Sequence, residues 1–331
     1  MAAAVGGGGI TTAMMLKGSA TVKGKKGTYT ADCYPRLCSL SNCHIAVAWH
    51  ALKSVVLAFP TTETDAQFIA RVTHMNLNAK KLTAVDHLDA CTNLRVLYLY
   101  ENSISTMRGF DALTNLTDLY LAHNRITRIE GLGCLRGLKK LYLDNNFIQR
   151  VEGLVACTQL EELTLNNQRF LATSASGQHD GGGATALSFD ADSLAAVAST
   201  LRTLQLSNSR AVDIAPLAVL SSLQVLHLAN NPISNFDDVA AVLAATDQLR
   251  ELRLSDTPVA GVHKYRDRIV IATRADIALL DGKKVSDRER VFLRTLAARK
   301  QQRQGQGQGQ PLSASELFAE SAGADAAGSP P

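Results

Sequence analysis

The densest group of residues able to bind a metal lies near the start of the chain: Cys33, Cys38 and Cys43 with His44 and His50. They are enough ligands for zinc, but the C-x4-C-x4-C spacing fits a common zinc finger only loosely, so we favour reduced thiols. The GxSxG, HExxH and CxxC motifs of hydrolases, zinc proteases and redox or zinc sites are absent from the sequence. We therefore expect no catalytic residues, no metal and no cofactor, and a protein that is not an enzyme.

Three tyrosines recur at a constant interval. Tyr98, Tyr120 and Tyr142 are 22 residues apart, so a structure that repeats every 22 residues places them at one position in three adjacent repeats. Tyrosine is a rigid amphipathic side chain that is common among the residues that dominate protein–protein binding. The alternative is that the three rings only stack on one another and strengthen a sheet. We favour the binding surface.

The elements that position these tyrosines belong to an internal repeat, L-x-x-L-x-L-x-x-N-x-I. Full copies begin at Leu94, Leu116, Leu138 and Leu223, and degraded copies at Val72, Leu160, Leu201 and Leu249. Each x-L-x-L-x segment predicts a short strand with its leucines in the core, and stacked copies predict a continuous parallel sheet. The expected fold class is α/β: a leucine-rich repeat solenoid of about eight repeats, with the sheet on its concave face and a C-terminal cap.

Side chains alternate along a strand, so the x positions of each repeat face the concave side. The predicted partner-binding residues lie at and beside these positions: Tyr98, Tyr100, Glu101, Asp118, Tyr120, His123, Lys140, Tyr142, Asp144 and Glu162. The asparagines of the full repeats are instead predicted to bond backbone groups at the turn: Asn102, Asn124, Asn146 and Asn231. Cys91, Cys134 and Cys157 precede the next repeat by three or four residues and are predicted to be small buried thiols.

Composition divides the chain into four segments. Residues 1–62 contain a single acid, Asp32, and predict a low-complexity, disordered arm; a transit peptide or a start site placed too early are the alternatives. Residues 63–262 hold the repeats, with an inserted loop at about 171–192 in which Asp190 is suited to cap a short helix. Residues 263–300 predict the cap, and the Gln/Gly-rich and then Ala/Ser/Pro-rich residues 301–331 a disordered tail.

Charge and hydropathy narrow the class of partner. Thirty-four Lys+Arg against 30 Asp+Glu leave a formal charge of +4, too mild to predict a nucleic-acid partner. The longest apolar stretch, residues 45–59, is shorter than a membrane-spanning helix and contains His50 and Lys53. Residues 262–303 hold twelve Lys/Arg against five acids. This excess is a solvated helix face or a site for an acidic partner such as a tubulin tail.

The end of the repeat region resembles a known cap. Pro258, Tyr265, Arg266, the run Leu279–Gly282 and the pair Glu289–Arg290 are similar to the C-terminal cap of the SDS22-type leucine-rich repeat family, whose repeats share the 22-residue period. The resemblance implies a regulatory subunit that binds the catalytic subunit of protein phosphatase 1. It also implies a cytoplasmic setting, at the centrosome, the cilium or the microtubule cytoskeleton.

Two observations qualify this expectation. The short phosphatase-docking motif, a basic residue followed by V-x-F, is missing, and the nearest segment, Arg95–Tyr98, uses Leu97 for the core. Phosphatase binding is therefore expected to use the folded surface. The spliceosomal U2 A′ protein shares this repeat and cap type, so a ribonucleoprotein component is the alternative function.

Overall fold

The computed structural model describes residues 19–24, 27–31, 70–85, 88–169 and 186–305. The chain forms two compact units, residues 1–201 and residues 202–331. They are called unit 1 and unit 2 below, and each is described by itself. The cysteine and histidine group at residues 33–50 and most of the predicted tail lie outside the described residues.

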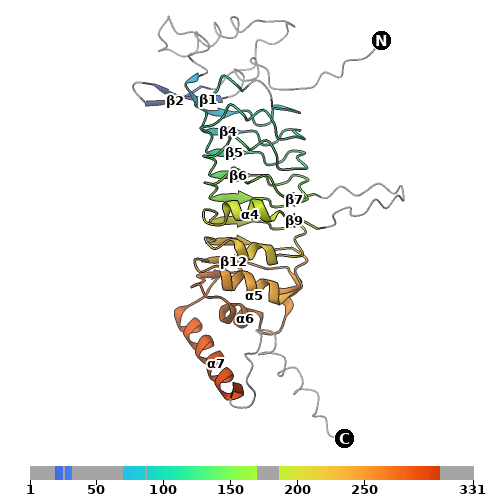
Figure 1. The fold of residues 1–331 in the computed structure, drawn as a ribbon, viewed down its shortest axis with the longest axis vertical. Coiled ribbons are helices and arrows are strands. Elements are labelled where there is room, and N and C mark those ends of the chain that lie inside the picture. Colours follow the sequence, from blue (N-terminus) through green and yellow to red (C-terminus); the bar gives the residue numbers. More distant parts are fainter. Residues whose placement is uncertain (1–18, 25–26, 32–69, 86–87, 170–185, 306–331) are drawn as a thin grey trace, which may run out of the picture. The chain divides into compact units, whose positions relative to one another are not determined.

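Unit 1 is built on a parallel sheet of short strands (Figure 1). The strands are β3 (Val72–Asn76), β4 (Val96–Tyr98), β5 (Asp118–Tyr120), β6 (Lys140–Tyr142) and β8 (Glu162–Thr164). Each pairs with the next in a register shifted by 22 residues, so that Leu97 lies opposite Leu119 and Leu119 opposite Leu141. These leucines are fully buried. The predicted leucine-rich repeat fold, with its strands in parallel and its leucines inside, is confirmed.

The repeat asparagines hold the turns as predicted. Asn124 donates from Nδ2 to the carbonyl oxygens of Leu121 (3.0 Å) and Leu99 (2.9 Å), and its Oδ1 accepts from the backbone N–H of Ile104 (3.0 Å). Asn102, Asn146 and Asn231 make the equivalent bonds in their own repeats. Each amide therefore satisfies backbone groups of two successive coils that would otherwise be buried without partners.

Turns close the far side of each coil in unit 1. In one repeat, the N–H of Leu135 bonds to the carbonyl of Leu132, and that of Leu138 to the carbonyl of Leu135. Gly131 precedes these turns with φ +71°, and a Cβ there would lie 2.2 Å from the carbonyl oxygen of Met107. Gly109 and Gly153 occupy the same position in their repeats. Glycine is therefore required where successive coils approach closely.

One predicted buried thiol is exposed. Cys91 and Cys157 are buried, whereas Cys134 is on the surface. The first two lie three residues before a repeat's first leucine, and Cys134 lies four before Leu138. Leu135 occupies the buried position instead. A shift of one residue therefore turns the cysteine outward.

Both ends of unit 1 carry additional elements. Strands β1 (Ser19–Gly24) and β2 (Gly27–Ala31) form an antiparallel pair, and β1 pairs with β3. This differs from the disordered arm expected there: threonine, valine and tyrosine around GKKG are a hairpin signal that the composition of the arm obscures. Beyond the insertion, β9 (Ser188–Phe189) pairs with β7 (Arg150–Val151).

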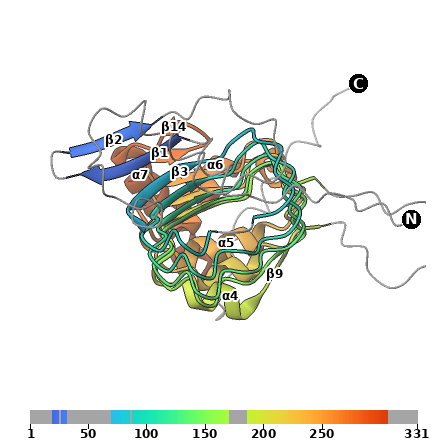
Figure 2. The same cartoon turned by 90° about the horizontal axis from the view of Figure 1, so that it is seen from above.

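A short helix follows β9, as predicted from Asp190. Helix α4 (Ala191–Val197) begins after this aspartate, whose carboxylate accepts from the backbone N–H of Ser193 at 3.0 Å. Seen along the stack, the coils of unit 1 lie one over the next, with β3 on one side and α4 on another (Figure 2). The helix therefore ends the inserted segment by rejoining the regular coil.

Unit 2 repeats the strand pattern with helices between the strands. Its parallel strands are β10 (Thr203–Gln205), β11 (Val225–His227), β12 (Glu251–Arg253) and β13 (Leu279–Leu280), and β14 (Lys283–Lys284) pairs antiparallel to β13. The helical elements are η1 (Ala215–Val219), α5 (Phe236–Ala245), η2 (Pro258–Gly261), α6 (Tyr265–Ala272) and α7 (Asp287–Gly305). Helix α7 thus extends five residues past the predicted end of the cap. Among the described residues, no helix has the length and apolarity needed to cross a membrane.

Candidate protein-interaction surface

The strands of unit 1 present aligned rows of side chains on the face opposite the core. One row runs His74, Val96, Asp118, Lys140 and Glu162, and the next runs Asn76, Tyr98, Tyr120, Tyr142 and Thr164. In β4, β5 and β6 the central leucine is buried and both neighbours are half-buried. We call this surface, with the residues that follow each strand, the strand face of unit 1.

The three tyrosines of the second row form a stack. The ring centroids of Tyr98 and Tyr120 are 4.7 Å apart, and those of Tyr120 and Tyr142 are 4.5 Å apart with nearly parallel planes. Tyr100 meets Tyr98 edge to face at 6.4 Å. Because the inner ring faces cover one another, a partner would meet ring edges and hydroxyl groups. The stacking on which the alternative interpretation rested is present, and it fixes the rings before any partner arrives.

The hydroxyl groups of the stack are linked to neighbouring acids. Burial, followed by a hydrogen bond to Glu162, raises the pKa of Tyr142. Burial and the charge of Asp118 raise the pKa of Tyr120, whose hydroxyl also interacts with that of Tyr142. Both phenols therefore stay protonated at neutral pH and keep their role as hydrogen-bond donors.

Carboxylates flank the stack, and two of them are held in place. Asp144 accepts from the hydroxyl of Thr164 at 2.6 Å and from the backbone N–H of Asn166 at 2.8 Å. Asp118 accepts from the hydroxyl of Thr117 at 2.6 Å. Oriented carboxylates of this kind suit a partner that offers cationic or N–H donors.

The positive charge of Lys140 partly offsets the negative charge of these carboxylates. Its Nζ lies 3.7 Å from Oε2 of Glu162, next to the stack. The predicted face contains four carboxylates, those of Glu101, Asp118, Asp144 and Glu162, against this one lysine. The face is therefore acidic as a whole, in contrast with the net positive chain.

The last row lies just past the strands. Glu101 and His123 are exposed and adopt left-handed backbone angles, with φ of +58° and +56°. Nε2 of His123 lies 3.2 Å from Nδ2 of Asn145, the corresponding residue of the next repeat. The turns after β4, β5, β6 and β8 therefore present one polar side chain each, Glu101, His123, Asn145 and Asn167, whereas the turn after β3 has Ala79 at this position.

Eight of the ten predicted binding residues lie in these three rows, and Tyr100 and Asp144 lie between the second row and the last, so the structure brings all ten together. Whether they bind a partner stays a prediction. Thr164 and Asn166 lie at outward positions of the same face but were not among the predicted binding residues, although they orient Asp144. No cluster of histidine, cysteine or acidic residues suited to a metal occurs within the described ranges.

Comparisons with known proteins agree with this geometry. One family model, described as "Leucine rich repeat", matches residues 70–126, and another, "Leucine Rich repeats (2 copies)", matches residues 114–156. These matches fall on the repeats whose strands, leucines and asparagines are described above. Residues 70–156 are leucine-rich repeats.

Solved leucine-rich repeat structures are similar to this chain at low identity. Internalin C2 of Listeria monocytogenes is 22% identical over 60% of this chain and 81% of its own, with a TM-score of 0.46. A leucine-rich repeat protein of Leptospira interrogans is 24% identical over 64% of this chain and 50% of its own, with a TM-score of 0.49.

The strand face of unit 2 has a different character. Glu251 accepts from His227 Nε2 at 3.0 Å and lies 2.9 Å from Nη2 of Arg253. Burial lowers the pKa of His227, which keeps the ring neutral at neutral pH. These polar groups bond to one another. The outward positions of β10, β11 and β12 hold no phenylalanine, tyrosine or tryptophan, so these strands lack the aligned aromatic anchors of unit 1.

Several basic residues of the cap of unit 2 form hydrogen bonds within the cap. The hydroxyl of Tyr265 donates to Oδ2 of Asp281 at 3.0 Å, and Oδ1 of that aspartate accepts from the backbone N–H of Leu254. Arg266 forms two hydrogen bonds to Glu289, at 2.7 and 3.2 Å. Arg268 is buried, with its guanidinium 4.1 Å from the centroid of the Phe236 ring.

The C-terminal helix adds further ties within the cap. Arg290 pairs with Asp287 and donates to the carbonyl of Ile277, and Arg294 donates to the carbonyls of Thr273 and Ala275. The basic residues that remain exposed are Lys264, Arg274, Lys283, Lys284, Arg288 and Arg299. Some of the basic residues counted in residues 262–303 therefore hold the cap together, and the others are exposed on its surface.

Proposed function

We propose that this leucine-rich repeat protein is a non-enzymatic scaffold that binds the catalytic subunit of protein phosphatase 1 through the strand face of unit 1. Leucine-rich repeats are suited to protein interaction because their stacked strands present a continuous surface. The observation that carries the proposal is the rigid tyrosine stack, with centroids 4.5 and 4.7 Å apart, beside oriented carboxylates. An aromatic surface fixed in advance loses little conformational entropy on binding.

The choice of phosphatase rests on the sequence resemblance. Residues 64–300, including TDAQFIARVTHMNLNAKKL and KYRDRIV, are similar to protein phosphatase 1 regulatory subunit 42, a member of the SDS22-type family. In the cap, the residues that carry this resemblance contact one another: Tyr265 bonds to Asp281, and Arg266 to Glu289. These contacts support a cap that the sequence motif specifies.

The manner of binding follows from the burial of Leu97. This residue is fully buried in β4, so Arg95–Tyr98 is not free to act as an extended docking peptide. The phosphatase is therefore proposed to meet the folded surface, in the cytoplasm at the centrosome, cilium or microtubule cytoskeleton. The exposed basic residues of the cap suit an acidic tubulin tail as a further partner.

Direct titration tests this proposal. The full chain is titrated with purified phosphatase 1 catalytic subunit, and in parallel with U2 small nuclear RNA and its RNA-binding protein. The proposal expects a phosphatase Kd of about 1 µM or below. Binding of the ribonucleoprotein components without the phosphatase would instead support the alternative function.

A further inference from the structure

Helix α7 has one face that packs on the cap. Leu293 is buried there, and Arg294 on the same side bonds to the backbone that follows α6. These contacts hold the first two turns of the helix against the cap. They leave the opposite side without any function in the cap.

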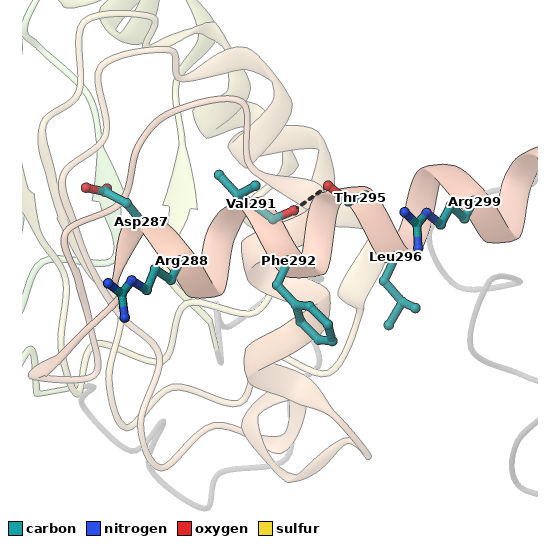
Figure 3. Close-up of a pocket in the computed structure, with 7 residues that line it drawn as sticks. All are labelled: Asp287, Arg288, Val291, Phe292, Thr295, Leu296 and Arg299. Carbon is teal, nitrogen blue, oxygen red and sulfur yellow. Dashed lines mark hydrogen bonds between the residues drawn. The ribbon is translucent and has the colours of Figure 1, made fainter.

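That opposite side is a regular stripe of large apolar residues. Val291, Phe292 and Leu296 are 66%, 65% and 53% exposed. They line an open pocket together with Asp287, Arg288, Thr295 and Arg299 (Figure 3). Three of the six large hydrophobic residues exposed in the described part of the chain lie here. A cluster of this kind indicates a surface that another segment covers.

The charge of the stripe restricts what can cover it. Arg288 and Arg299 stand at its two ends, and neither is among the arginines that tie the cap together. The hydroxyl of Thr295 is satisfied within the helix by the carbonyl of Val291 at 2.7 Å. The stripe therefore suits a short segment with large apolar residues in the middle and carboxylates on either side.

The chain itself supplies such a segment beyond α7. Residues 306–331 contain three acids and neither lysine nor arginine. Their large apolar residues are Leu312, Leu317 and Phe318, and the last two lie between Glu316 and Glu320. The order of charges and apolar residues in Ser315–Glu320 thus complements the order along the stripe.

The connection is long enough for this segment to fold back. Thirteen residues of helix separate Phe292 from Gly305, a rise of about 20 Å. Eleven residues from Gly305 to Glu316 span up to about 36 Å when extended.

We propose that Ser315–Glu320, here called the tail segment, docks on the α7 stripe of the same molecule. Leu317 and Phe318 would cover Val291, Phe292 and Leu296, while Glu316 and Glu320 would lie near Arg288 and Arg299. The inference is independent of phosphatase binding, since the stripe and the strand face of unit 1 belong to different units.

Photo-crosslinking in the full chain tests the proposal. Phe318 is replaced by benzoylphenylalanine, dilute protein is irradiated, and the products are mapped by mass spectrometry. The expected product joins position 318 to residues 288–299 within one molecule. Crosslinks confined to other regions would overturn the proposal. A mixture of isotopically light and heavy chains identifies joints between two copies, and mixed joints alone would overturn it as well.

Matched variants show whether the stripe is responsible. Val291→Ser/Phe292→Ser/Leu296→Ser is expected to lower the yield of the α7 crosslink at least about fivefold. The control variant is Val155→Ser/Val212→Ser/Val219→Ser, which changes three exposed valines outside α7 and should leave the crosslink yield unchanged. Equal yields in the two triples, with circular dichroism showing both folded, would contradict docking on the stripe.

A charge reversal provides a second test that leaves the apolar residues intact. Arg288→Glu/Arg299→Glu should reduce the crosslink, and combining it with Glu316→Arg/Glu320→Arg should restore it. Both effects should weaken with added salt, because exposed charges are screened. Failure of the combined variant to recover the crosslink would contradict the proposed pairing.

Discussion

The repeats of unit 1 and the cap of unit 2 are held together by different kinds of contact. In the repeats, buried amides bond to backbone groups, and the same bonds recur every 22 residues, as at Asn124 and Asn146. In the cap, partly exposed arginines bond to carboxylates and carbonyls, each in a contact made once, as between Arg266 and Glu289. Buried, backbone-directed bonds should therefore contribute more to stability than the charged ties of the cap.

The largest loss of stability is expected when a repeat asparagine is replaced. Asn124→Ala leaves the N–H of Ile104 and the carbonyls of Leu99 and Leu121 buried without this partner. The free energy of unfolding should fall by about 3 kcal/mol or more, measured by urea denaturation. Asn115→Ala is the control, because its exposed amide makes a single bond, to the carbonyl of Thr92. Equal losses for the two variants would contradict the importance of burial.

A smaller loss is expected where two coils approach closely. Gly131→Ala adds a Cβ 2.2 Å from the carbonyl oxygen of Met107 at a backbone φ of +71°. The coils must separate or the backbone must change, at a cost of about 2–3 kcal/mol in thermal or urea unfolding. Gly133→Ala serves as the matched control, since nothing lies within 4 Å of its added Cβ. A harmless Gly131→Ala would show that the coils are more loosely stacked than described.

The cap should be less sensitive to the loss of one tie. Arg266→Ala removes the two bonds to Glu289 and one to the carbonyl of Lys284. Because the pair is partly exposed, we expect a loss of about 1 kcal/mol in urea unfolding. Arg274→Ala, which removes an exposed arginine nearby, should change stability little. A loss as large as that of Asn124→Ala would reverse the proposed ranking of the two regions.

The last prediction concerns the chemical reactivity of the cysteines of unit 1. Burial raises the pKa of the Cys91 and Cys157 thiols to about 11, so both stay protonated at pH 8 and below. Cys134 is exposed. Iodoacetamide at pH 8 should therefore modify Cys134 in the folded protein and spare the other two, as read by peptide mass spectrometry. Rapid modification of Cys91 or Cys157 without denaturant would show that the coils open locally.

The periodic contacts explain why the repeats could be predicted from sequence. A leucine or asparagine that recurs every 22 residues occupies the same place in each repeat, so its position in the fold can be predicted. The row through Tyr98, Tyr120 and Tyr142 then follows from the alternation of side chains along a strand. Cys134 shows the limit of this reasoning, since a shift of one residue exchanged inside for outside. The orientation of Asp144 by Thr164 was also missed, because it depends on distances between neighbouring coils.

The contacts of the cap, which do not recur along the chain, could not be predicted in the same way. No period connects Tyr265 with Asp281 or Arg290 with the carbonyl of Ile277, so only resemblance to a known cap indicated that region. The β1–β2 pair was hidden by the low-complexity composition around it. Position in a repeat therefore predicts structure where interactions recur, and it predicts little where the chain departs from the repeat.

The central claim, that the tyrosine stack of unit 1 binds the phosphatase, is tested by one affinity measurement. Changing Tyr98, Tyr120 and Tyr142 together to alanine should weaken binding to the catalytic subunit by about 100-fold or more, since anchor residues dominate an interface. The control changes Arg108, Glu130 and Arg136, exposed residues between the same strands, to alanine and should leave the Kd unchanged. Both triples must first show native circular dichroism. If the folded tyrosine triple retains the original Kd while the control loses it, the binding surface lies on the turns and the account is contradicted.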